Sequence, residues 1–61
     1  MLEEYTVVRA KRQLGEKVIR GTTGTILIVH DSSLGVYEVE FIDGDGHYLD
    51  LLTVDESDLE I

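Results

Sequence analysis

The sequence contains no cysteine, no proline and no tryptophan. Because cysteine is absent, neither a disulfide scaffold nor a thiolate metal site can form. No apolar run approaches the roughly 18 residues that a membrane-spanning helix requires, and no basic stretch followed by an apolar segment marks a signal peptide. We therefore expect a cytoplasmic protein that does not cross a membrane.

Basic residues are scarce, with 5 Lys and Arg against 13 Asp and Glu and a net charge of −8. They are also unevenly placed. Residues 21–61 carry ten acids and no base. All the bases lie in residues 1–20: Arg9, Lys11, Arg12, Lys17 and Arg20. An acidic body of this kind repels phosphate backbones and attracts basic surfaces. A basic protein is therefore the favoured partner, and nucleic acid is disfavoured.

The chain of 61 residues is short enough to form only one domain, spanning residues 1–61. A domain of this size buries only about 60% of the surface that its unfolded chain exposes, so its stability margin is small. A catalytic cleft would use apolar surface that the core needs. The size therefore favours an interaction module over an enzyme. A structural subunit that completes its core by self-association stays open as an alternative.

Short stretches rich in β-branched and aromatic residues alternate with glycine-containing turns, and they predict strands at residues 5–10, 25–30, 36–42, 47–52 and 58–61. In the third stretch Tyr37, Val39 and Phe41 share one face. In the second, Ile26 and Ile28 are expected to point inward. A long polar loop precedes the second strand. The pattern from Thr53 to Glu56 matches a capping box, which predicts one helical turn before the last strand.

These elements predict an all-β, five-stranded SH3-like barrel with a long first loop, whose closure would remove most strand edges. An OB-fold is second, because it normally needs a longer chain. The segments Gly21-Thr-Thr-Gly24-Thr-Ile26, Tyr37-Glu-Val-Glu-Phe41 and Asp43-Gly-Asp-Gly46, closed by Asp58-Leu59, resemble a family of small uncharacterised bacterial SH3-like proteins. The resemblance implies the fold and no activity. Because some members of the family are encoded beside predicted toxins, the resemblance also implies an antitoxin or immunity role.

Several segments superficially match ligand sites. An EF-hand loop beginning at Asp43 needs glycine at its sixth position and glutamate at its twelfth, where this chain has Tyr48 and Val54. A hairpin turn is therefore expected there. The glycines at 21 and 24 lack the lysine of a phosphate-binding loop. His30 and His47 lack metal-ligand spacing. We expect no catalytic, cofactor-binding or metal-binding residues.

A mixed apolar and acidic face is the remaining candidate. The outer face of the third strand carries Glu38, Glu40 and Ile42, and Leu27 and Val29 are expected beside them on the second strand. An apolar centre with an acidic rim suits a basic protein, and an ordinary solvated strand face is the alternative interpretation. The predicted partner-binding residues are Glu38, Glu40, Ile42, Asp43, Asp45 and Asp50. The alternative is a nucleic-acid or ribosome-associated module of the KOW type, which would use the five bases of the first third of the chain.

Overall fold

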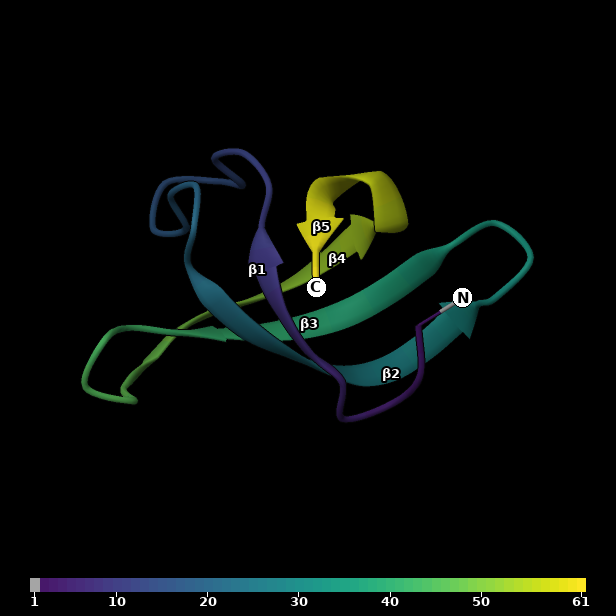
Figure 1. Ribbon diagram of the computed structural model, residues 1–61, viewed down its shortest axis with the longest axis horizontal. Coiled ribbons are helices and arrows are strands. Elements are labelled where there is room, and N and C mark those ends of the chain that lie inside the picture. Colours follow the sequence, from purple (N-terminus) through teal and green to yellow (C-terminus); the bar gives the residue numbers. More distant parts are fainter. Residues whose placement is uncertain (1) are drawn as a thin grey trace.

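Five strands and one 3-10 turn make up the computed structural model, which describes residues 2–61. The strands are β1 (Val7–Ala10), β2 (Thr23–Asp31), β3 (Val36–Ile42), β4 (Tyr48–Asp55) and β5 (Leu59–Glu60), with the 3-10 turn η1 (Glu56–Asp58) before β5. All pairings are antiparallel, and the strand order is β4-β3-β2-β1-β5 (Figure 1). The predicted five-stranded all-β fold, with its long first loop and late helical turn, is confirmed.

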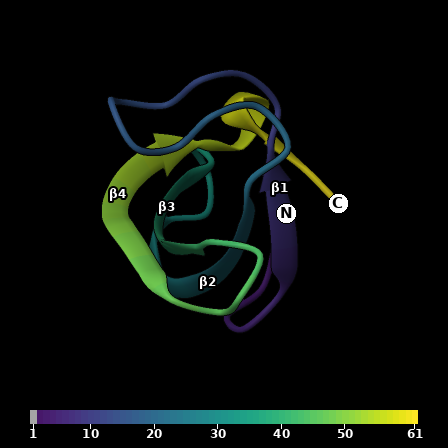
Figure 2. The same ribbon diagram turned by 90° about the vertical axis from the view of Figure 1, so that its left-hand side faces the viewer.

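The sheet curls around its own core, as the end-on view shows (Figure 2). Within the described residues, the pairing stops at β4 and at β5. The curl is therefore a half-barrel that keeps two strand edges, whereas closure was expected. The described part of the chain contains no helix long and apolar enough to cross a membrane.

The core lies on the concave face of the sheet, and β3 supplies its centre. Tyr37, Val39 and Phe41 are each fully buried, which confirms the alternation read from the sequence. Val8 and Ala10 of β1, Ile26 of β2, Val54 of β4 and Leu59 of β5 complete this core, together with Leu2 and Val18. The long loop is anchored by Val18, which is fully buried, and by Leu14, which packs against the core, whereas Ile19 is 63% exposed.

The expected facing of β2 is wrong after Ile26. Ile26 is fully buried, but Ile28 is 48% exposed and lies opposite Glu38, while Val29 packs against the core. An irregularity in the pairing between Ile26 and Ile28 explains the change. One extra residue in a strand reverses the alternation beyond it. Ile28 therefore lies on the outer face, where regular alternation would place its neighbours Leu27 and Val29.

The helical turn begins two residues later than expected. Its cap is Asp55, whose side chain accepts a hydrogen bond from the Ser57 N–H at 2.8 Å, while the Asp58 carboxylate accepts one from the Asp55 N–H at 3.1 Å. Thr53 lies within β4. A carboxylate can fill either end of such a reciprocal cap, which lets Asp55 and Asp58 take these two positions.

Candidate functional site

Cross-strand pairing gathers apolar and acidic side chains on the convex face of the sheet. Val7, Thr25, Glu40 and Leu51 lie in one row across four strands, and Ile28, Glu38 and Thr53 lie in the next. Directly opposed residues share a face. We call this the outer-face patch and define it as Val7, Ile28, Glu38, Glu40, Ile42 and Leu51. Val7, Ile28 and Leu51 are 60%, 48% and 42% exposed, so the patch presents substantial apolar surface to solvent.

Glu38 is held in place by two neighbours. Its Oε1 accepts a hydrogen bond from the Thr53 hydroxyl at 2.7 Å and lies 2.9 Å from His30 Nε2. The hydrogen bond to His30, followed by that from Thr53, lowers the pKa of the Glu38 carboxyl. Glu38 is therefore a fixed, ionised carboxylate on the outer-face patch.

Glu40 is half-buried beside Leu51 and Thr25, and it makes no side-chain hydrogen bond or ion pair with any residue of the described chain. Glu40 therefore differs from Glu38, whose carboxylate is engaged by His30 and Thr53.

Asp43 and Asp45 lie in the turn between β3 and β4, directly after Ile42 at one end of the outer-face patch. Asp43 Oδ1 accepts hydrogen bonds from the backbone N–H groups of His47 and Asp45, both at 2.9 Å. These bonds, that of His47 first, lower the pKa of Asp43. The carboxylates of Asp43 and Asp45 and the His47 ring lie close enough to share a metal ion. Asp43 is already engaged in closing the turn, which confirms the expected hairpin.

Asp50 does not share the face of the sheet that carries Glu38 and Glu40. It pairs with the core residue Phe41, and its Oδ1 accepts a hydrogen bond from the Leu51 N–H at 2.9 Å. Because β4 is an edge strand of the sheet, Asp50 lies at this edge. The residue that pairs with Glu40 is Leu51. The predicted site residues thus divide into the outer-face group of Glu38, Glu40 and Ile42, a turn with two aspartates, and an edge aspartate.

The basic residues do not converge on one surface: Arg9 lies on the convex face, in the same row as Ile42, and the loop bases lie elsewhere. Arg12 donates to the Ser57 carbonyl at 3.1 Å and lies 3.5 Å from the Asp58 carboxylate. Lys17 and Arg20 line a groove that Asp43 also lines, so these two bases share the groove with a carboxylate. Lys11 lines a different groove. The loop bases are thus interspersed with carboxylates.

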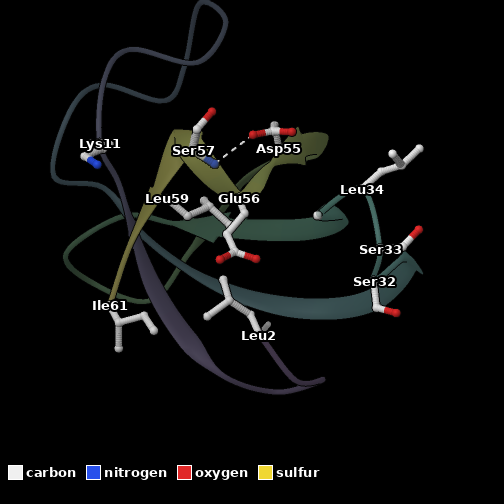
Figure 3. Close-up of a pocket in the computed structure, with 11 residues that line it drawn as sticks. Leu2, Lys11, Ser32, Ser33, Leu34, Asp55, Glu56, Ser57, Leu59 and Ile61 are labelled. Atoms are coloured by element: carbon white, nitrogen blue, oxygen red, sulfur yellow. Dashed lines mark hydrogen bonds between the residues drawn. The ribbon is translucent and has the colours of Figure 1, made fainter.

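The groove that contains Lys11 lies at one end of the sheet, between the β2–β3 turn, η1 and the C-terminal residues (Figure 3). Glu56 projects into it and accepts a hydrogen bond from the buried Tyr37 hydroxyl at 2.8 Å, which in turn accepts one from the Leu2 N–H at 3.0 Å. The Leu2 N–H alone would lower the pKa of Tyr37, but burial and the Glu56 carboxylate outweigh it and raise this pKa. This chain of bonds fixes the N-terminal segment onto the core.

Sequence reasoning missed Val7, Ile28 and Leu51 as members of the outer-face patch. Val7 and Leu51 could have been found from strand register, had the sequence specified it. Ile28 could not, because its outward position depends on the irregularity in β2.

A family model described as a domain of unknown function (DUF4926) matches residues 4–61, almost the whole chain. The comparisons with curated proteins and with solved structures found no match. The chain therefore belongs to the DUF4926 family.

Proposed function

We propose that this chain is a non-enzymatic module that binds a basic protein through the outer-face patch. The observation that carries the proposal is Glu40, a half-buried carboxylate without a cation partner in the described chain, set among exposed apolar side chains. An apolar surface bordered by polar and charged groups is typical of protein recognition. A partner's lysine or arginine would supply the missing charge.

The charge of the whole chain supports the same partner chemistry. Ten acids and no base in residues 21–61 create a field that draws basic surfaces toward the molecule. Electrostatic attraction of this kind mainly speeds association and weakens as salt increases. In the sharpest form of the proposal, the chain is an antitoxin or immunity protein that neutralises a basic, nucleic-acid-handling partner by covering the surface that would contact phosphates.

The first experiment is affinity capture of the tagged chain from a lysate of the organism that encodes it, with and without nuclease, followed by mass spectrometry. Glu40→Lys is the test variant. Glu16→Lys, which makes the same charge change in the exposed first loop, is the control. We expect one basic protein that survives nuclease, elutes with salt and is retained by Glu16→Lys but lost with Glu40→Lys. Capture that depends on nucleic acid contradicts the proposal and favours the KOW-type alternative. Recovery of only the chain itself favours self-association.

A further inference from the structure

A third cleft lies next to the outer-face patch, where the N-terminal segment crosses β2. It is open to solvent and has a volume of about 600 Å³. Its lining consists of Leu2, Glu3, Glu4, Tyr5, Ile28 and Val29. Ile28 belongs to both the cleft and the patch, so the two surfaces are continuous. We call this the Tyr5 cleft.

Tyr5 has an unusual backbone conformation. Its φ is 67°, in the left-handed region, and it is the one non-glycine residue with positive φ in the described chain. Hydrogen bonds from the Tyr5 N–H to the Ile26 carbonyl and from the Thr6 N–H to the Glu3 carbonyl hold this conformation. A bulky residue is costly in this region, where glycine is the usual choice. Tyr5 is 72% exposed, so no burial in the core offsets this cost.

The chemistry of the cleft selects one kind of occupant. Leu2 and Val29 pack on the core and provide an apolar floor, while Glu3 and Glu4 are exposed acids at the rim. Of the described residues that line the cleft, none is a base. An apolar floor fits an aliphatic chain, two carboxylates fit a cation, and an aromatic face binds a cation as well. A phosphate or an acidic peptide would meet like charge.

We propose that the Tyr5 cleft receives a lysine or arginine side chain of the basic partner protein. This inference rests on the proposed function, of which it names a specific contact. The aliphatic stem lies along Ile28 and Val29, and the cationic head lies between the Tyr5 ring and the carboxylates of Glu3 and Glu4. Strain at Tyr5 then has a use, because it places an exposed aromatic ring beside two acids.

The test uses small probes, so that it does not depend on the partner. Amide shifts of the chain are followed by NMR during titration with Nα-acetyl-lysine methylamide, with the arginine analogue, and with the neutral norleucine analogue. We expect the lysine probe, the arginine probe or both to shift the amides of residues 3–5 and 28–29. Norleucine should shift them much less. Equal effects of all three probes, or shifts spread over the acidic surface, would overturn the proposal. Shifts that depend on protein concentration without a probe would also overturn it, by identifying a second copy as the occupant.

Two tyrosine variants separate the cleft from general surface binding. Tyr5→Gly should weaken cation binding about two- to fivefold, the effect of one exposed cation–π contact. Tyr5→Phe, which keeps an aromatic ring, should bind the cation as tightly as the parent chain does. Tyr48→Ala, which removes another exposed tyrosine outside the cleft, is the matched control and should change nothing. Equal losses in Tyr5→Gly and Tyr48→Ala would contradict the assignment.

Stability provides an independent readout. Because glycine relieves the strain at position 5, the melting temperature of Tyr5→Gly should equal or exceed that of the parent chain. A lower melting temperature would show that Tyr5 is retained for folding. Failure of this inference is distinguishable from failure of the proposed function. If the probes do not bind in the cleft while Glu40→Lys still abolishes partner capture, only the cleft is wrong.

Discussion

At the scale of single residues, close packing at β2 explains why a glycine stands in the middle of a strand. Gly24 pairs with Phe41, and a Cβ at position 24 would lie 2.7 Å from Val39 Cγ1 and 2.8 Å from Phe41 Cδ1. Both neighbours are fully buried, so neither has room to move. The glycine lets the Phe41 ring lie against the backbone of the adjacent strand.

Gly24→Ala should therefore destabilise the fold. Overpacking of a well-filled core typically costs about 1–3 kcal/mol, and we expect a loss in this range in urea-unfolding experiments. Gly44→Ala is the control, because nothing lies within 4 Å of a Cβ there. The control should change the free energy of unfolding by less than about 0.5 kcal/mol. Similar losses in the two variants would show that the Phe41 contact is not the cause.

At the scale of elements, β3 organises both surfaces of the molecule. Its alternate residues form the centre of the core and the acidic positions of the outer-face patch. Glu38 connects β3 to β4 through Thr53 and to β2 through His30. These bonds make the Glu38 carboxylate part of the sheet as well as part of the candidate site.

This connection predicts a pH dependence. The pKa of Glu38 in the folded chain is lowered from its usual value of 4.5, so protonation favours the unfolded state. The stabilisation is present above pH 4.5 and is lost as the pH falls through the folded pKa. The melting temperature of Glu38→Gln should therefore fall less between pH 7 and pH 3 than that of the parent chain.

Glu40→Gln is the matched control, since it removes a charge from the same strand without removing a hydrogen bond within the described chain. Its pH dependence should follow that of the parent. Acidification also relieves repulsion within a chain of net charge −8. Both variants share this effect, so the difference between them isolates the bonds of Glu38. No difference between them would contradict the role assigned to His30 and Thr53.

The sequence predicted the elements well because local patterns determine them. Strand alternation at Tyr37, Val39 and Phe41 and the Asp-Gly turn after Ile42 are readable from a few adjacent residues. The irregularity in β2 and the register of β4 are not, because they depend on long-range pairing. The candidate site was therefore predicted at Glu38, Glu40 and Ile42, while Ile28, Leu51 and the conformation of Tyr5 required the structure.

At the scale of the whole molecule, the acidic net charge and the apolar outer-face patch act over different distances. The acidic body attracts cationic surfaces over a distance of about 10 Å at moderate salt. The outer-face patch then offers apolar contact around Glu40 at short range. Under the proposed function, long-range attraction would govern how fast the basic partner associates, and the apolar contact around Glu40 would govern how slowly it dissociates.

The most direct test of this account is the binding kinetics of the captured basic partner with Glu40→Lys and Glu16→Lys, measured at low salt and at about 0.15 M salt. The two variants carry the same net charge and differ only in where the base is placed. We predict that Glu40→Lys raises the dissociation constant about tenfold or more at both salt concentrations, and that Glu16→Lys only modestly slows association at low salt. Equal effects of the two variants would contradict the central claim, because binding would then depend on overall charge and not on the outer-face patch.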